Sequence, residues 1–238
     1  MTPEQEYISH EPRQYTTKEK FSNWFYYYKW WLLIALILLY IIGSMIWNKL
    51  GIGRSAPDYR FAYVGSRFLP KQCAEILERQ LACLGEDVNG DGVVKVEIRQ
   101  YVTGDMTDPE NLTYGYASEI KLMVDISEGE SYFFLLEDPE AFQLNYQVLT
   151  HLDGSIPDDS DFSITDKVLC WGDCPVLSGL ELGDFEAADM NQAVAGSYQE
   201  WLSSLYFGRR FFSDESSVKN REEQEELWRI LTEGAPDA

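Results

Sequence analysis

Residues 118–142, SEIKLMVDISEGESYFFLLEDPEAF, contain the pattern that decides the fold. The first part has side chains at the spacing of one helical face, namely Ile120, Met123, Val124 and Ser127. The short apolar run at 131–137 predicts a strand that is buried on both faces. Asp138 and Pro139 then start a helix, as its cap and its first residue, and we expect this helix to run to about Thr150.

The residues before this stretch repeat the alternation of strand and helix. Residues 59–65, YRFAYVG, predict a buried strand, and residues 70–85 predict a helix that begins with Pro and stops at Gly. Residues 94–98 alternate apolar and charged side chains, which is typical of a strand with one polar face. Such alternation implies right-handed crossovers and a mainly parallel sheet with helices on its faces. We therefore predict an α/β fold, with one three-layer domain over residues 58–234.

The C-terminal part of this domain has a less regular pattern. The predicted segments are a strand at 167–171, a helix at 187–205, a strand at 206–212 and a helix at 220–233. In the last helix, Leu227, Ile230 and Leu231 share the inward face, and Gly234 is the stop.

An uncharged run of nineteen residues lies near the N-terminus, from Trp30 to Asn48. At about 1.5 Å per helical residue, it nearly covers the ~30 Å hydrocarbon core of a bilayer. Aromatic residues crowd its start and Trp47 marks its end, as in the aromatic belts of membrane helices. We interpret residues 30–48 as a transmembrane helix and uncleaved signal anchor, through which the chain contacts the lipid bilayer. Residues 1–29 are then a disordered cytoplasmic tail, and residues 49–57 are a linker.

The negative charge of the chain lies beyond this apolar run. Residues 51–238 hold 36 acidic and 14 basic residues, a net charge of −22, whereas residues 1–50 have a net charge of +1. This balance excludes nucleic acid as a partner, because phosphate binding requires a basic surface. Four basic residues precede the run and three follow it closely, which favours a cytoplasmic N-terminus. The prediction is a single-pass protein of the cell membrane whose acidic domain is extracytoplasmic.

Residues 119–142, preceded by strand, helix and strand, resemble the first lobe of extracytoplasmic solute-binding proteins of the type 2 periplasmic-binding fold. In that lobe the second helix ends in a Gly-containing turn, and a hydrophobic strand with an acidic tip and another helix follow. The resemblance covers residues 58–152. It implies a membrane-anchored binding domain for a small solute or an envelope protein, without evident catalysis. The alternatives are a structural or protein-interaction module of a cell-envelope complex, and a carboxylate-based glycan hydrolase.

Ligands of open α/β sheets bind outside the carboxyl ends of the parallel strands. The predicted strand ends carry seven candidate ligand-binding residues, namely Ser66, Arg67, Tyr101, Thr103, Glu137, Asp138 and, after a later strand, Trp171. The same residue types also occur in ordinary loops. Nucleophile-elbow, zinc-protease, phosphate-loop and dinucleotide motifs are absent, so no catalytic residue is predicted.

Residues 87–92, DVNGDG, match the first half of an EF-hand calcium loop, with Asp87, Asn89 and Asp91 as oxygen ligands. The twelfth position of such a loop requires a bidentate Glu, but here it is Ile98. The alternative is a helix-to-strand turn, in which Asn-Gly and Asp-Gly supply residues with positive φ. The pattern thus suits either a turn or a weak calcium site, and no other cofactor is predicted.

The chain has four cysteines. Cys73 and Cys83 are ten residues apart on one predicted helix, which separates them by about 15 Å and prevents a bridge. Cys170 and Cys174 enclose Trp-Gly-Asp, and a disulfide between them would close a small loop. Their C-x₃-C spacing differs from the redox motif C-x-x-C. The prediction is one structural disulfide, Cys170–Cys174.

Overall fold

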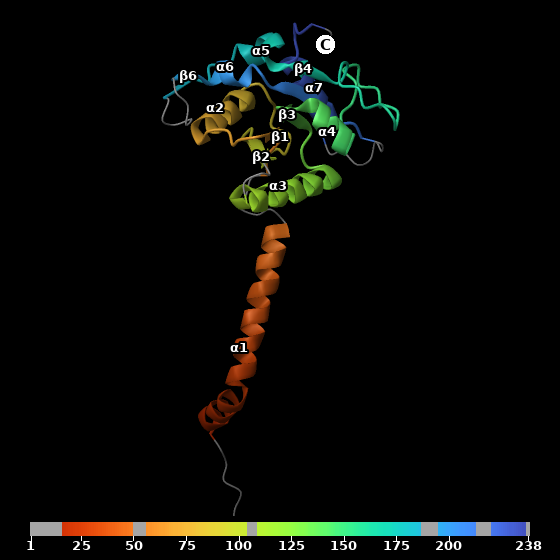
Figure 1. Cartoon of the computed structure of the whole chain (residues 1–238). Coiled ribbons are helices and arrows are strands. Elements are labelled where there is room, and N and C mark those ends of the chain that lie inside the picture. Colours follow the sequence, from red (N-terminus) through yellow and green to blue (C-terminus); the bar gives the residue numbers. More distant parts are fainter. Residues whose placement is uncertain (1–15, 50–55, 104–108, 187–194, 213–219, 237–238) are drawn as a thin grey trace, which may run out of the picture. The chain divides into compact units, whose positions relative to one another are not determined.

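The computed structural model describes residues 16–49, 56–103, 109–186, 195–212 and 220–236 (Figure 1). The chain divides into two compact units, Met1–Arg54 and Ser55–Ala238.

The described part of the first unit is helix α1, Thr17–Lys49. Its stretch Trp24–Ser44 is 21 residues long, apolar, and wholly unburied. By length and composition it is long enough to cross a membrane, as a signal sequence or an anchor close to the N-terminus does.

Helix α1 begins well before the predicted span, so Thr17–Lys29 is helical rather than disordered. Extending an existing helix is easier than nucleating one. Aromatic side chains at helical spacing add contacts there: the ring centroids of Phe21 and Trp24 are 6.0 Å apart, and those of Trp24 and Tyr28 are 5.6 Å apart. The rest of the predicted tail, residues 1–15, lies outside the described residues.

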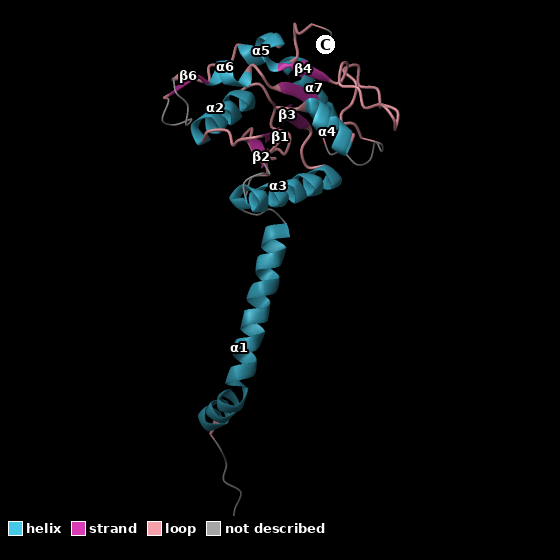
Figure 2. Ribbon diagram, viewed as in Figure 1, coloured by secondary structure: helices cyan, strands magenta, loops and turns pink. Residues whose placement is uncertain are grey.

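A five-stranded mixed sheet in the order β2-β1-β3-β7-β4 forms the centre of the second unit (Figure 2). Strand β1 (Tyr59–Gly65) pairs in parallel with β2 (Val96–Val102) and with β3 (Phe133–Leu136). Strand β7 (Tyr206–Arg209) is antiparallel to both β3 and β4 (Val168–Cys170). The predicted mainly parallel sheet is therefore only partly parallel, because β7 lies between β3 and β4 and runs in the opposite direction to both.

Helices connect these strands and cover the sheet. They are α2 (Lys71–Ala82), α3 (Pro109–Glu128), α4 (Pro139–Tyr146), the 3₁₀ turn η1 (Trp171–Asp173), α5 (Pro175–Ser178), α6 (Tyr198–Leu202) and α7 (Arg221–Leu231). A separate two-stranded sheet pairs β5 (Asp184–Phe185) with β6 (Gly196–Ser197).

Two apolar clusters lie on opposite faces of the sheet. Alternate residues of β1 supply them: Phe61 belongs to the cluster with α2, α5, α6 and α7, and Ala62 belongs to the cluster with α3 and α4. In the first cluster the ring of Phe133 lies between those of Phe61 and Phe207, at centroid distances of 4.6 and 5.8 Å. Since both faces are covered at the centre of the sheet, β1 and β3 carry almost continuous apolar runs.

Three predicted segments differ from the structure. Helix α3 begins at Pro109, before the helical pattern predicted from residue 118. Helix α4 ends at Tyr146 rather than near Thr150, because Gln147 adopts a left-handed conformation (φ 50°). The chain after it forms an antiparallel bridge between Leu149 and Arg210, which a helix would prevent. Of the helix predicted at 187–205, residues 187–194 lie outside the described residues, and the helical part is α6.

Helix α7 buries Leu227 and Leu231 as predicted, while Ile230 is half-buried. Trp228 is also buried, and its ring stacks on Phe207 at a centroid distance of 4.7 Å. This ring contact joins the last helix to β7.

The buried carboxylate of Asp58 holds the loop between α2 and β2. Its Oδ1 accepts hydrogen bonds from the N–H groups of Val88 and Asn89 at 3.0 and 2.9 Å, and its Oδ2 accepts one from the N–H of Lys95 at 2.8 Å. The main-chain oxygen of Asp58 accepts a bond from Gln224 Nε2 at 2.9 Å. Asp58, which directly precedes β1, thus connects the loop between α2 and β2 to α7.

We expect Asp58→Ala to lower the free energy of unfolding by about 2–4 kcal/mol, because backbone N–H groups lose their acceptor. Urea denaturation of the full chain in detergent micelles measures this change. The matched control is Glu86→Ala, an exposed acid of the same loop. A loss of equal size in the control would contradict the role assigned to Asp58.

Candidate functional site

A hollow of about 480 Å³ lies at the carboxyl ends of the parallel strands β1, β2 and β3. Four of the seven predicted ligand-binding residues line it, namely Ser66, Thr103, Glu137 and Asp138. Helix α3 adds Glu119, and α4 adds Asn145 and Tyr146. We call this set of residues the acidic hollow.

Ser66 and Glu137 connect the ends of β1 and β3 within the acidic hollow. The Ser66 hydroxyl donates a hydrogen bond to Glu137 Oε1 at 2.9 Å, and the Ser66 N–H donates to Glu137 Oε2. The last residue of β1 must be small, because a Cβ at Gly65 would overlap the Tyr63 hydroxyl and lie 2.9 Å from Glu137 Oε2. Gly65 therefore allows the backbone to approach the carboxylate.

Asp138 lines the acidic hollow and also caps α4. Its Oδ1 accepts a hydrogen bond from the N–H of Ala141 at 2.9 Å, as the predicted Asp-Pro-Glu start requires. Because this oxygen is committed to the cap, Asp138 also has a structural role.

The acidic hollow has a negative potential. Its described lining residues include three carboxylates, from Glu119, Glu137 and Asp138, and no basic side chain. Burial raises the pKa of the Tyr146 hydroxyl, and the Glu119 carboxylate adds to this shift. Burial likewise raises the pKa of Tyr63, with Glu137 as the second cause. Such a site attracts cationic groups and donors of hydrogen bonds.

A second hollow of about 720 Å³ adjoins the first and shares Ser66 with it. Arg67 and Lys121 are its basic lining residues, and Phe68 and Tyr114 supply exposed rings. The two neighbouring hollows therefore differ in charge.

Tyr101 and Trp171 line neither hollow. Tyr101 is 5% exposed, and its hydroxyl donates a hydrogen bond to Asp125 Oδ2 at 2.6 Å. Trp171 is 1% exposed, and its indole N–H donates to Gln199 Oε1 at 3.1 Å. Both side chains belong to the core, so they are unavailable to a ligand in this conformation.

Cys170 and Cys174 are free thiols in this structure. The Cys170 thiol donates to the main-chain oxygen of Ser203 at 3.4 Å. Cys174 is fully buried, and burial raises the pKa of its thiol to about 11. The disulfide between them stays a prediction for oxidising conditions.

The side chains of the loop at 87–92 bind its own backbone. Asp87 accepts hydrogen bonds from the N–H groups of Gly90 and Gly92 at 2.8 and 2.7 Å. Asn89 and Asp91 likewise accept from main-chain N–H groups two residues ahead, at 2.9 and 3.0 Å. Gly90 and Gly92 have positive φ, as the turn interpretation requires.

The acid that a calcium loop needs at its twelfth position is absent from this turn. Ile98 occupies that position on β2 and is buried. The neighbouring carboxylate, Glu97, forms ion pairs with Arg60 and Arg99 at 3.3 Å. Both observations favour the turn over the calcium site.

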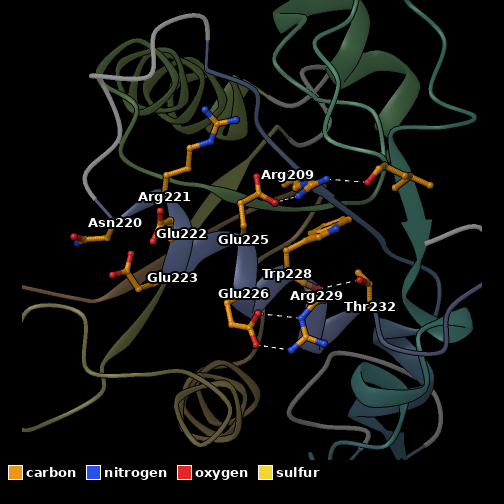
Figure 3. A pocket seen from close by; sticks show the side chains of 11 residues that line it. Arg209, Asn220, Arg221, Glu222, Glu223, Glu225, Glu226, Trp228, Arg229 and Thr232 are labelled. Carbon is orange, nitrogen blue, oxygen red and sulfur yellow. Dashed lines mark hydrogen bonds and ion pairs between the residues drawn. The ribbon is translucent and has the colours of Figure 1, made fainter.

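A larger hollow, about 1020 Å³, lies along α7 (Figure 3). Figure 3 shows two ion pairs among its charged side chains: Arg209 with Glu225, and Glu226 with Arg229. Arg209 is 4% exposed and also lies over the Trp228 ring, at 4.8 Å from the centroid. Because Arg209 and Glu225 join β7 to α7, we assign this hollow a structural role.

Sequence reasoning missed the residues of α7 and β7 that form this cluster. The available signal was Arg209-Arg210 within the strand predicted at 206–212, since two charged residues in succession are unusual in a buried strand. It also missed Glu119 and Tyr146, which reach the acidic hollow from two different helices.

A buried lysine, Lys167, stabilises the loop that precedes β4. The Lys167 side chain is fully buried, and its ammonium donates to the main-chain oxygens of Asp161 and Ser163 at 3.0 and 2.7 Å. It also pairs with the Asp161 carboxylate at 2.8 Å. These bonds compensate the burial of the charge, so Lys167 is a structural residue.

Comparison with known proteins identifies no relative: no family model matches the chain, and neither a curated protein nor a solved structure is significantly similar to it.

We expect calcium titration of the full chain, at about 0.15 M salt, to give no saturable calorimetric signal below millimolar concentration. The reason is that the loop offers too few free oxygens for the 6–8 ligands that Ca²⁺ takes. The comparison variant is Asp91→Ala. A saturable heat in the native chain that this variant abolishes would establish a calcium site and contradict the turn.

Proposed function

We propose that residues 58–234 form an extracytoplasmic binding domain, which α1 anchors to the cell membrane and which holds a small solute in the acidic hollow. The observation that carries this proposal is the hollow itself, at the shared carboxyl ends of three parallel strands. Ligands of open α/β sheets bind at this edge, where loops and helix starts converge.

The order of the helices and strands supports a likeness to a lobe of type 2 solute-binding proteins. Strand β1, helix α2 and strand β2 lead to α3, which ends at Gly129 with a φ of 67°. Strand β3 follows with Glu137 at its tip, and α4 begins directly after it. This succession is the one on which the resemblance rests.

The charge of the acidic hollow favours a cationic ligand. Glu119 on α3 and the neighbouring Glu137 and Asp138 after β3 supply carboxylates from two chain segments, so a positive group placed between them approaches several acceptors. Ser66 holds the Glu137 carboxylate in place, which reduces the entropy lost when a ligand binds. A small amine is the simplest solute of this kind.

The same three carboxylates also favour a second candidate, a glycan hydrolase. Such enzymes use two carboxyl groups about 5–10 Å apart on either side of the scissile bond. Two measurements separate the two functions. A binding domain is stabilised by its ligand without reaction, whereas a hydrolase releases reducing ends from oligosaccharides.

We expect small amines, such as a diamine or a cationic amino acid, to raise the unfolding temperature of the full chain in detergent micelles. Neutral sugars should not raise it. The substitution Glu137→Gln removes one charge from the hollow, and we expect it to weaken amine binding about tenfold or more. The measurement is the midpoint of a ligand titration followed by thermal shift.

The matched control is Glu140→Gln, an exposed acid on α4 that does not line the acidic hollow. An equal loss of affinity in both variants would refute the assignment, because it would indicate a response to net charge alone. Sugar-dependent stabilisation with release of reducing ends would instead establish the hydrolase.

The proposed topology predicts that protease added to intact spheroplasts removes the domain after α1. A tag on the N-terminal tail should stay protected, and it should migrate with a fragment that contains α1. Lysed spheroplasts are the control for protease activity. Complete protection of the domain would contradict an extracytoplasmic location, and loss of the tag from the mature chain would indicate a cleaved signal sequence.

A further inference from the structure

The outer face of α3 is apolar and exposed. Tyr116, Ile120, Met123 and Val124 follow the i, i+4, i+7, i+8 spacing of one helical face and are 52%, 63%, 55% and 47% exposed. The opposite face carries Leu122, which is fully buried. Helical spacing predicts one face for three of these residues, Ile120, Met123 and Val124, and that face is directed away from the core.

Two further exposed rings belong to the second hollow rather than to this apolar face. Tyr114 on α3 and Phe68 after β1 are 76% and 63% exposed, and both line the second hollow. Within the described part of residues 56–236, four of the ten exposed large apolar side chains lie on the apolar face of α3. Apolar side chains concentrated in this way mark an interaction site, whereas scattered ones do not.

Two opposite charges lie on the same flank of this face. Lys121 and Glu128 are both exposed, and neither forms an ion pair with a described residue. They are seven residues apart, about two helical turns, so both project to the same side of the stripe. A second α3 packed antiparallel brings each Lys121 opposite Glu128 of the other copy, whereas parallel packing brings like charges together.

We propose that α3 forms the contact surface of a symmetric dimer, in which two copies pack their α3 helices antiparallel. Pairing Lys121 with Glu128 of the other copy places Val124 next to the two-fold axis. Ile120 and Met123 then extend the apolar contact on either side of this axis. The interface is isologous, so the same patch serves both copies.

The composition of α3 favours a second copy over a lipid surface. Helices that lie in the membrane interface carry a polar face rich in Lys and Arg. Beside the exposed apolar face of α3, the charged residues are one lysine, Lys121, and two acids, Glu119 and Glu128, so the flanks of this face are not rich in basic residues. The net charge of −22 on residues 51–238 also disfavours an anionic leaflet. Repulsion between two such domains is weakened at physiological salt, where charges more than about 8 Å apart are screened.

Cysteine crosslinking of the full chain in detergent micelles tests the proposal. The background carries Cys83→Ser and Cys170→Ser, since Cys73 and Cys174 are fully buried. We expect Val124→Cys to form a disulfide-linked dimer upon mild oxidation. Tyr116→Cys should not, because antiparallel packing separates the two copies of this residue by about 25 Å along the helices.

The matched control is Leu144→Cys on α4, which is 62% exposed and lies outside the surface. Equal crosslinking at Val124 and Leu144, or no crosslinking at Val124, would overturn the dimer. Equal crosslinking at Val124 and Tyr116 would overturn the antiparallel arrangement.

Charge reversal in the Val124→Cys background provides an independent test. Lys121→Glu alone, or Glu128→Lys alone, should lower the crosslinked fraction about tenfold, because each places like charges opposite one another. The double variant restores opposite charges and should restore crosslinking. Failure of the double variant to recover, while circular dichroism shows a folded chain, would overturn the proposed pairing.

Discussion

Strand β1 is the constraint on which the rest of the domain depends. It is seven residues long, only Arg60 is partly exposed, and both of its edges are paired in parallel. A parallel partner requires a crossover that returns the chain to the same end of the sheet, which α2 and α3 supply on opposite faces. The carboxyl ends of β1, β2 and β3 therefore share one edge, and the acidic hollow forms there.

Strand β7 completes the sheet from a distant part of the chain. It lies between β3 and β4, and it is antiparallel to both. Phe207 contacts Phe133 on β3 and Trp228 on α7, so one aromatic side chain connects two strands and the last helix. Arg209 is buried with Glu225 and Trp228 as its partners, which makes this connection polar as well as apolar. Burial of the charge is tolerated because two of the three guanidinium nitrogens have partners: Nη1 pairs with Glu225, and Nη2 donates to the main-chain oxygen of Leu152. Only Nε has no hydrogen-bond partner among the described residues.

The orientation of α3 follows from a buried carboxylate rather than from its apolar stripe. Asp125 is 2% exposed and accepts hydrogen bonds from the Tyr101 hydroxyl and from the N–H and hydroxyl of Ser131. A buried charge with several donors is stable, and an unpaired one is costly. Placing Asp125 and Leu122 inward leaves Ile120 and Val124 outward. The surface that we propose as a dimer contact is thus a consequence of this polar network.

The sequence by itself determined the local structure and the class of fold. Period-two and period-3.6 patterns, the Asp138 cap and the apolar strand runs predicted β1, β2, β3 and the starts of α2 and α4, because these signals act over a few residues. Four of the seven candidate ligand residues line one hollow, since parallel strands end at one edge. Only the tertiary structure decided that Tyr101 and Trp171 are core residues, that β7 is antiparallel, and which face of α3 is buried. These outcomes depend on partners such as Asp125 and Ser131, Trp171 and Gln199, or Phe133 and Phe207. A pattern within one segment contains no information about which distant groups will satisfy it.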